Sequence, residues 1–592
     1  MTNATTSFTP RYTNLVQILD QSAQRFGHKP LFGTRKADGW QWTTYNEFQR
    51  LVGAAASALQ RMGVGPGDRV AVISNNRLEW AIFAYGTYSL GAAYVPTYES
   101  QSTDEWAFIL QDSGAKVCFV ANAMIRDQIA AVREQIPNLQ HVICFDCGEA
   151  ESLLGEGAGH PINLQVPSDD TVASLIYTSG TTGKPKGVML THFNLASNAS
   201  ACLEISPASG EERSLAFLPW AHVFGGALEL NSQIAYGASM AICEDTSHLL
   251  EYLPEVQPTM LFAVPRIWNR VYDGVRKQVS DKPKAVQQIF DRGMIAKSKK
   301  RRGETLSLSE KVVLALAEKL VFSKIVARFG GRLKFAFSGA AALSAEVAQF
   351  VDNLGITVLE GYGLTETSAG TTGSTLADRR FGAVGKPFPG VVIKIAEGVG
   401  GARPGEGEII VYGQGVMKGY YNLPEVTREA FTADGGFRTG DLGRIDGDGF
   451  LYITGRVKEL FKLENGKYVA PAPLEEKLQL SSYIAQAVIF GADRPYTVAL
   501  IVPDMATLRS WAASEGIETH DATLVEAPRV RELLRSEIET HSRDFKGYES
   551  VRDFVVDTEE LSIANGMLTP TLKVKRRKVM EKYGKQLASL YH

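Results

Sequence analysis

Apolar and polar positions follow a repeating order through the first 200 residues of the chain. From Thr43 onward, a helix with an apolar stripe, a glycine stop and a short run rich in Val, Ile and Ala succeed one another. This order is typical of βα units around a parallel sheet. A further helix is predicted after Ser102, because Ser102 and Glu105 have the spacing of a capping box. The other predicted elements are helices over 44–62 and 76–90 and strands over 69–74, 92–97, 116–121 and 141–146.

The character of the chain changes after Gly455. Two strand-like runs, 484–491 and 497–503, flank a turn as in a hairpin. Two helical stretches follow, at 505–516 and 529–545. We therefore predict an α/β protein with two domains. A large N-terminal domain of layered βαβ units covers 1–455 and includes a small β-rich portion near 385–450, and a smaller α+β domain covers 456–592.

Residues 270–332 look helical and interrupt the alternation. Six basic side chains gather there where Asp291 is the only acid: Arg292, Lys297, Lys299, Lys300, Arg301 and Arg302. Such a run is usually a solvated face. The alternative is a contact of 292–302 with a membrane surface or with the phosphates of CoA.

The composition narrows the class of protein. The 592 residues carry a formal net charge of −3, so no positive field exists to hold DNA or RNA. Five cysteines, an odd number in so long a chain, favour a reducing compartment, and we expect the cytoplasm. Because no second ligand pair has similar spacing, we interpret Cys144-x-x-Cys147 as a strand end rather than a zinc or redox site. We expect neither a secretory signal at the start nor a membrane span in the uncharged run 81–102, which glycines and a proline interrupt.

A run of small and hydroxyl residues carries the first candidate chemistry. Residues 177–188 read YTSGTTGKPKGV directly after an apolar strand, and their N–H groups and hydroxyls suit phosphate oxygens. The run differs from a Walker A loop, because Pro185 follows Lys184 where a Ser or Thr would bind Mg²⁺. The residues expected to bind phosphate are Thr178, Ser179, Gly180, Thr181, Thr182, Gly183 and Lys184.

Further motifs follow along the chain. They are LPWAHVFGG at 218–226, SGAAAL at 338–343, EGYGLTET at 360–367, RTGD at 438–441, GRVKE at 455–459 and TLKVKRR at 571–577. Together with the phosphate loop, and in this order, they resemble the adenylate-forming ligases of the acyl-CoA synthetase superfamily over nearly the whole chain. The long insertion after VPRIW at 264–268 resembles the AMP-forming long-chain fatty acyl-CoA synthetases in particular.

The resemblance implies a reaction in two steps. A carboxylate attacks the α-phosphate of ATP and gives an acyl-adenylate and pyrophosphate, after which the thiol of CoA displaces AMP and forms a thioester. The implied substrate is a long-chain fatty acid. The reaction also requires ATP, Mg²⁺ and CoA, and the resemblance implies that the C-terminal domain is mobile. Two alternatives stay open: transfer to acyl carrier protein instead of CoA, and an inactive protein that binds or takes up fatty acids. Self-association as a homodimer is also left open.

The resemblance assigns most nucleotide-binding residues to four motifs. Tyr362 is expected to stack on adenine, with the SGAAAL turn on the other side. Glu366 is expected to bind Mg²⁺ together with Thr181, since a carboxylate near a triphosphate is otherwise repelled; a Glu at a helix N-terminus is the alternative. Asp441 suits two ribose hydroxyls, because a carboxylate has two acceptor oxygens, and a turn Asp is the alternative. The nucleotide set comprises Gly339, Ala340, Glu360, Gly361, Tyr362, Gly363, Asp441, Arg456, Lys458 and Lys462.

Lys573 in TLKVKRR matches the lysine that neutralises charge during adenylation. Many relatives have Gly before this lysine, whereas this chain has Leu572, so Lys575 stays the alternative register. Lys458 matches the position at which the family pivots its small domain, and a surface pair with Glu459 is the alternative.

His222 and Thr365 complete the residues assigned to catalysis. The family places the motif of His222 where the acyl pocket, the adenylate and the thiol channel meet, whereas a hydrogen-bonded core His is the alternative. Gly225 and Gly226 are expected to leave space beside His222 for a long acyl chain.

Overall fold

Two compact units make up the chain. The computed structural model describes residues 8–178, 184–517, 520–569 and 572–591. The first unit comprises the residues up to 393 together with 411–437, and the second comprises 394–410 and 438–592. The predicted boundary of a mobile domain at 455/456 stays a prediction.

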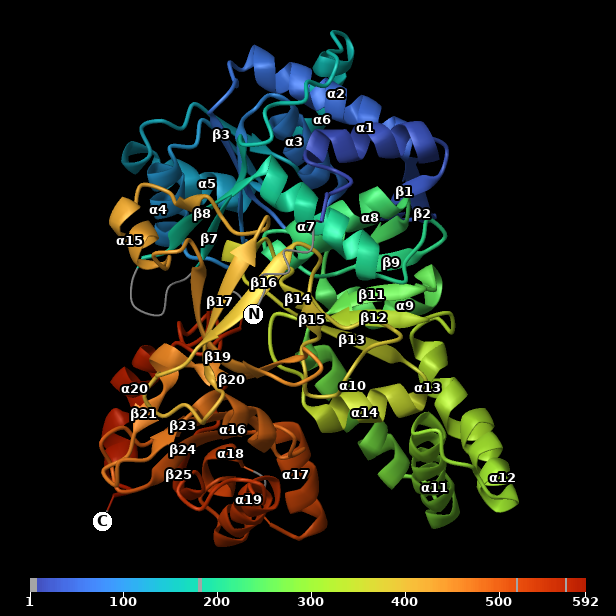
Figure 1. Ribbon diagram of the computed structural model, residues 1–592, viewed down its shortest axis with the longest axis vertical. Helices are drawn as coiled ribbons and strands as arrows, with labels where there is room; N and C mark the ends of the chain where they lie inside the picture. The colour runs from blue at the N-terminus through green and yellow to red at the C-terminus, as the bar shows by residue number, and fades with distance from the viewer. Residues whose placement is uncertain (1–7, 179–183, 518–519, 570–571, 592) are drawn as a thin grey trace. The chain divides into compact units, whose positions relative to one another are not determined.

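A seven-stranded sheet organises the N-terminal part of the first unit (Figure 1). Its strands are β3 (Arg69–Ile73), β4 (Ala93–Thr97), β5 (Val117–Val120), β6 (His141–Cys144), β7 (Val172–Thr178), β8 (Lys186–Thr191) and β18 (Gly419–Tyr420), in the order β18-β8-β7-β4-β3-β5-β6. From β7 to β6 the strands are parallel, and β8 and β18 add antiparallel pairs at one edge. The four strands predicted between 69 and 146 are confirmed.

Two further sheets belong to the first unit. One has the order β2-β1-β10-β9 and consists of β1 (Pro30–Lys36), β2 (Gly39–Thr44), β9 (Arg213–Ala216) and β10 (Ser239–Ile242). The other contains, in chain order, β11 (Met260–Ala263), β12 (Phe335–Ser338), β13 (Thr357–Tyr362), β14 (Thr372–Gly373) and β15 (Lys386–Pro387). Because β11, β12 and β13 are parallel, their carboxyl ends lie at one edge, where ligands commonly bind.

Helices pack around these sheets. They are α1 (Leu15–Phe26), α2 (Tyr45–Arg61), α3 (Leu78–Ser89), α4 (Thr103–Ser113), α5 (Ala123–Ala131), α6 (Glu149–Ala158), α7 (His192–Ile205), α8 (Leu230–Tyr236), α9 (Leu249–Val256), α14 (Ala345–Leu354) and α15 (Pro424–Glu429). At the start of α4, Ser102 Oγ accepts from Glu105 N at 3.3 Å and Ser102 N donates to the Glu105 carboxylate at 3.2 Å. The predicted capping box is therefore present.

The insertion is helical, as predicted. It contains α10 (Pro265–Ser280), α11 (Lys284–Arg301), α12 (Leu308–Ala317), the π-helical turn η4 (Glu318–Phe322) and α13 (Ser323–Arg328). Four of the six basic side chains form ion pairs: Lys297 with Glu318 at 2.8 Å, Lys299 with Glu310 at 2.6 Å, Arg301 with Asp352 at 3.2 Å and Arg302 with Glu304 at 2.5 Å. Acids from neighbouring segments thus neutralise much of the run 292–302.

The predicted β-rich portion is a four-stranded sheet in the order β16-β17-β19-β20. Its strands are β16 (Val391–Ala396), β17 (Gly407–Gly413), β19 (Phe437–Ile445) and β20 (Leu451–Arg456). Further along, the second unit contains η6 (Val457–Glu459), β21 (Phe461–Lys462), β22 (Tyr468–Val469), α16 (Pro471–Leu478), β23 (Ile484–Phe490), β24 (Thr497–Pro503), α17 (Met505–Ser514), α18 (Asp521–Leu524), α19 (Pro528–His541), β25 (Val551–Val556) and α20 (Arg576–Ala588). The predicted hairpin (β23 and β24) and the two predicted helices (α17 and α19) are confirmed.

Strand β6 ends at Cys144, as expected of the CxxC segment. The turn that follows brings the Cα atoms of Cys144 and Cys147 within 5.3 Å, and the two residues form a disulfide, which the cysteine count did not predict. Among the described residues, every helix is too short or too polar to cross a membrane.

Candidate active site

A pocket in the first unit gathers many of the predicted site residues. Its volume is about 610 Å³ including the open mouth. Part of its lining is apolar and comes from Ile205, Leu228, Phe262, Phe337, Leu359 and Phe388. The lining also contains the predicted residues His222, Gly339, Ala340, Glu360, Gly361, Tyr362 and Gly363. Residues expected to bind a nucleotide therefore meet an apolar surface in one cavity.

The segment that carries His222 is fixed by Asn76. The Asn76 side chain accepts from Trp220 N at 2.8 Å and donates to Leu218 O at 2.8 Å. Phe224 N donates to His222 Nδ1 at 3.3 Å, so the neutral imidazole carries its proton on Nε2. His222 is half-buried and lines the pocket. It is therefore not the fully buried core histidine that was the alternative interpretation of this motif.

The two glycines after His222 pack against backbone. They begin η2 (Phe224–Glu229), a π-helical segment. A Cβ on Gly225 would lie 2.6 Å from Pro219 O, and a Cβ on Gly226 would overlap Trp220 O. The prediction that these glycines leave space for an acyl chain is therefore wrong. They let η2 approach the preceding segment, which any side chain would prevent.

Two polar side chains on neighbouring strands face the pocket. Ser338 on β12 and Glu360 on β13 are register partners, and both are buried. The Ser338 hydroxyl has no hydrogen-bond partner among the described residues. Burial raises the pKa of Glu360 to about 8, although a hydrogen bond from Gly382 N–H opposes the rise. Glu360 is therefore mostly a neutral carboxylic acid at pH 7, able to donate a hydrogen bond.

The raised pKa of Glu360 predicts a pH-dependent stability. Unfolding returns this pKa to its ordinary value of 4.5, so the unfolded chain releases a proton that the folded chain retains. The stability that Glu360 contributes is thus complete below pH 4.5 and is lost by about 1.4 kcal/mol per pH unit as the pH rises towards 8. We expect Glu360→Gln to gain melting temperature relative to the natural protein between pH 5 and pH 8. A constant difference across that range would contradict the buried, protonated carboxyl.

Gly363 has no room for a side chain. A Cβ there would overlap Ala369 O, whereas a Cβ on Gly339 would meet Phe224 and Gly361 at ordinary distances of 3.4 and 3.5 Å. We expect Gly363→Ala to destabilise the first unit by about 1–3 kcal/mol, because overpacking must displace the backbone. Gly339→Ala is the matched control and should leave the melting temperature nearly unchanged. Equal melting temperatures for the two variants would show that the loop relaxes freely.

Glu366 lies beside the base of the phosphate loop. Tyr420 Oη donates to Glu366 Oε1 at 2.9 Å, and Met417 N donates to Glu366 O at 2.8 Å. Lys186 Nζ lies 4.9 Å from the centroid of the Tyr420 ring. Lys186 pairs with Thr178 across β7 and β8, so the two ends of the loop lie side by side, next to the tyrosine that binds this carboxylate.

The phosphate loop itself is described only at its ends. Ser179, Gly180, Thr181, Thr182 and Gly183 lie outside the described residues. Thr178 ends β7, and Lys184 Nζ lies 5.1 Å from the ring centroid of Phe108 on α4. Thr365 is buried at the start of the 3₁₀ turn η5 (Thr365–Thr367) and does not line the pocket.

The second unit brings Asp441 and Arg456 together. They are opposite each other on β19 and β20, and Arg456 Nε donates to Asp441 Oδ1 at 2.6 Å. Asp441 lies inside a strand, so the alternative of a turn Asp is wrong. The remaining lysines are exposed: Lys458 lies in η6, and Lys462 Nζ is 5.9 Å from the ring centroid of Tyr468.

Lys573 is exposed, and its backbone is hydrogen-bonded to Thr569. Thr569 Oγ1 accepts from Lys573 N at 3.0 Å, and Thr569 N donates to Lys573 O at 2.8 Å. Leu572 has φ +61°, a left-handed conformation that favours glycine. Lys575 is the half-buried residue that caps α20. The left-handed conformation of Leu572 suits the glycine that the family resemblance implies before the catalytic lysine, and the Lys573 register stays a prediction.

The sequence did not single out three residues that shape these sites. Ser338 could have been found from the sequence, because it directly precedes Gly339 in the SGAAAL motif. Asn76 and Tyr420 had no local signal, because each acts on a segment far away in the sequence.

Comparison with known proteins places this arrangement in a family. The model of the AMP-binding enzyme family matches residues 19–421, and the model of its C-terminal domain matches residues 458–592. The chain therefore belongs to the AMP-binding enzymes, the adenylate-forming superfamily, and among them to the long-chain acyl-CoA synthetases.

Relatives and solved structures agree with this assignment. The long-chain-fatty-acid–CoA ligase FadD15 of Mycobacterium tuberculosis is 35% identical over 94% of both chains. The human long-chain-fatty-acid–CoA ligase 1 is 30% identical over 98% of this chain and 86% of its own. The adenylation domain of a carboxylate reductase from Mycobacterium chelonae has the same fold, with a TM-score of 0.80 and 23% identity over 98% of this chain and 91% of that chain.

Proposed function

We propose that this protein activates a long-chain fatty acid with ATP and transfers the acyl group to CoA, which releases AMP and pyrophosphate. The observation that carries the proposal is the pocket in which an apolar lining meets His222, Glu360 and Tyr362. A fatty acid requires both parts, because its chain needs apolar surface and its carboxylate must reach a nucleotide. Relatives named long-chain-fatty-acid–CoA ligase support the substrate and the acceptor.

In this proposal the nucleotide lies along the glycine-rich turns. Tyr362 stacks on adenine opposite Gly339 and Ala340, and protonated Glu360 can hydrogen-bond the uncharged base without adding negative charge. Asp441 accepts from the ribose hydroxyls and retains acceptor capacity beside Arg456. His222 meets the reacting carboxylate, and Thr365 fixes the loop that carries Glu366.

The residues present fit a Mg²⁺ ion. Magnesium is commonly held by one or two carboxylates together with substrate phosphates and water. No group of three metal-binding side chains occurs among the described residues, and Glu366 offers one half-buried carboxylate beside the phosphate loop. Glu366, with Thr181, would hold the ion, which would neutralise phosphate charge when bound. Tyr420 orients the carboxylate through its hydrogen bond.

The two steps call for different charges near the α-phosphate. We propose that Lys573 neutralises charge during adenylation and leaves for the thioester step, as the domain 456–592 moves about Lys458. Lys462 contributes positive charge to the nucleotide site in this scheme.

AMP release from ATP tests the function. We expect release to require a fatty acid, to rise from acetate towards C18 chains, and to turn over only with CoA. Adenylation that acyl carrier protein discharges and CoA does not would favour the alternative acceptor. Absence of AMP release with every acid would favour an inactive fatty-acid-binding protein.

Three finer expectations accompany this function. The cytoplasm is the expected compartment. Contact of 292–302 with a membrane surface stays the alternative to a solvated face. Self-association as a homodimer stays a prediction that sedimentation velocity would test.

A further inference from the structure

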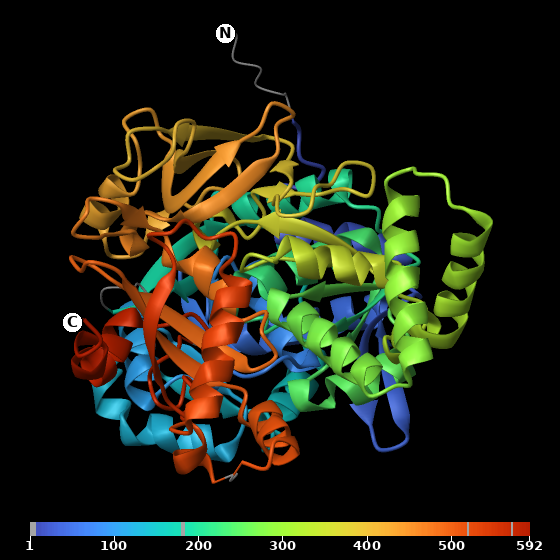
Figure 2. The ribbon, with the colours of Figure 1, turned by 90° about the horizontal axis from the view of Figure 1, so that it is seen from below.

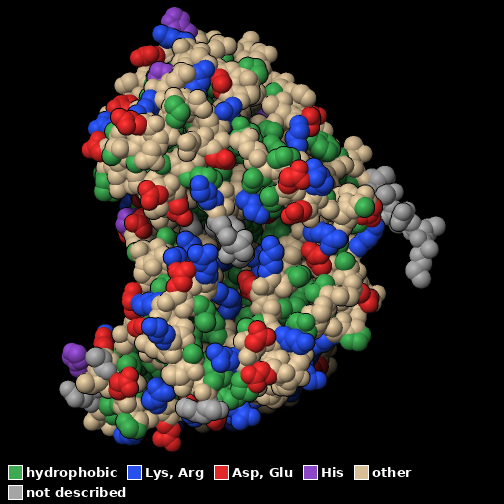
Figure 3. Space-filling view, turned by 90° about the vertical axis from the view of Figure 1, so that its left-hand side faces the viewer, with side chains coloured by type: hydrophobic (Ala, Val, Ile, Leu, Met, Phe, Trp, Pro, Cys, Tyr) green, Lys and Arg blue, Asp and Glu red, His purple; other side chains and the backbone are tan. Residues whose placement is uncertain are grey.

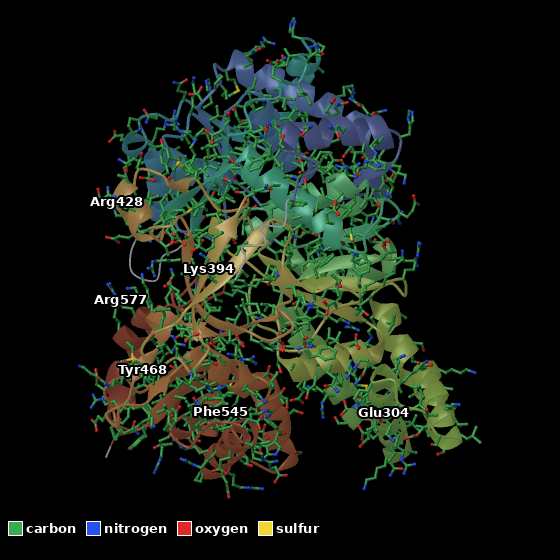
Figure 4. The ribbon with its side chains drawn as sticks, in the orientation of Figure 1. Glu304, Lys394, Arg428, Tyr468, Phe545 and Arg577 are labelled. Atoms are coloured by element: carbon green, nitrogen blue, oxygen red, sulfur yellow. A yellow bond between two sulfur atoms is a disulfide. The ribbon has the colours of Figure 1, made fainter. Side chains whose placement is uncertain are left out.

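One face of the insertion is apolar and exposed. Leu308, Val312, Leu316 and Leu320 follow one another along α12 and η4 at four-residue spacing, which places them on one side of the helix. Their exposed fractions are 82%, 60%, 41% and 43%. We call these four residues the outer row. Figures 1 and 2 show α12 on the outside of α11, away from the sheets.

The contacts with α11 come from the other side of the helix. The opposite side of the helix packs on α11, where Ala317 contacts Gly293 and the ring of Phe322 lies 5.8 Å from that of Phe290. The helix is apolar on two opposite faces. One face packs on α11, and the other, the outer row, is exposed to solvent.

The segment that carries the outer row has an excess of basic side chains. Between Lys284 and Arg328 the sequence has eleven lysines and arginines but four aspartates and glutamates, in a protein whose net charge is −3. Glu310 and Glu318 are already paired with lysines of α11. Lys311 and Lys319 flank the row, are exposed, and have no acidic partner among the described residues.

We propose that the outer row docks on an anionic phospholipid surface, with its apolar side chains at the acyl boundary and Lys311 and Lys319 among the headgroups. Apolar residues edged by lysines are the composition of helices that lie in a membrane interface. A second copy of this chain is a poor occupant, because two surfaces of the same positive charge repel each other. The inference takes up the alternative of a membrane contact given above and moves its centre from 292–302 to α12 and η4.

Vesicle binding by the full-length protein tests the proposal. The probes are vesicles of phosphatidylcholine alone and vesicles that also contain phosphatidylglycerol, without ATP or CoA. We expect binding to the anionic vesicles only, and binding that weakens as salt rises. Replacing the outer row by Leu308→Gln, Val312→Gln, Leu316→Gln and Leu320→Gln should weaken it at least about 10-fold.

A matched control uses exposed apolar residues elsewhere in the first unit. Met124→Gln with Leu250→Gln changes side chains that are 66% and 77% exposed and should leave vesicle binding unchanged. Lys311→Gln with Lys319→Gln should reduce binding and flatten its salt dependence. AMP release with detergent-solubilised fatty acid should be equal in all variants, so a failure of the ligase proposal is seen separately.

Several outcomes would overturn the proposal. They are equal binding of the natural protein to both vesicle types, no binding to either, or unchanged binding by the variant of the outer row. A dimer in sedimentation velocity that this variant abolishes would instead assign the outer row to self-association.

Discussion

Lys573→Ala is expected to lower the rate of acyl-adenylate formation by about 100- to 1,000-fold, the loss typical of removing one charge-stabilising group. The same variant should form thioester from preformed acyl-AMP and CoA at nearly the natural rate. The reason is that charge on the phosphates develops in the first step, and we propose that the exposed Lys573 supplies a compensating charge there. The two rates are measured separately, by pyrophosphate release and by acyl-CoA formation.

Lys575→Ala is the control for the register. Lys575 caps α20 and its N–H donates to Met567 O at 2.8 Å, a backbone contact that the substitution retains. We expect adenylation by this variant to remain within a few-fold of the natural rate. If both steps fell equally in Lys573→Ala, or if Lys575→Ala lost adenylation instead, the role given to Lys573 would be wrong.

Glu366→Gln is expected to reduce AMP formation about 100-fold or more and to raise the Mg²⁺ concentration required for activity. The amide keeps an oxygen that can accept from Tyr420 Oη, so the loop should hold its position. What is lost is the negative charge, which Mg²⁺ prefers in its ligands. Titration of activity with Mg²⁺ at fixed ATP separates a loss of metal affinity from a loss of folding.

Tyr420→Phe removes the hydrogen bond to Glu366 but keeps the carboxylate. We expect a loss of about 10-fold or less, with the Mg²⁺ requirement only slightly raised. A Glu366→Gln enzyme with natural activity at every Mg²⁺ concentration would remove this carboxylate from the metal site.

The alternation of the fold could be predicted because local rules and tertiary packing agree there. The capping box at Ser102 and the apolar strands of the parallel sheet are each determined by neighbouring residues. Antiparallel β8 and β18 at the sheet edge could not be predicted in this way, because their pairing joins residues more than 200 positions apart. The disulfide between Cys144 and Cys147 depends on the path of one turn.

The residues of the active site also differ in how well the sequence predicts them. Motif residues such as Tyr362, Gly363 and His222 could be assigned because each motif carries its own pattern, and the structure brings them to one pocket. The wrong expectation for Gly225 and Gly226 came from treating missing side chains as open space. Backbone carbonyls fill that space, and a sequence pattern does not show which backbone approaches.

The apolar lining of the pocket also sets a limit on which acids can enter. Phe262, Phe337 and Leu359 form part of its lining, which includes no lysine or arginine among the described residues. A dicarboxylic acid would have to bring its second charge against this surface without a counter-ion, at a cost of several kcal/mol. We therefore expect the cavity to favour the methyl end of a fatty acid over a second carboxylate, by excluding charge rather than by recognising a group.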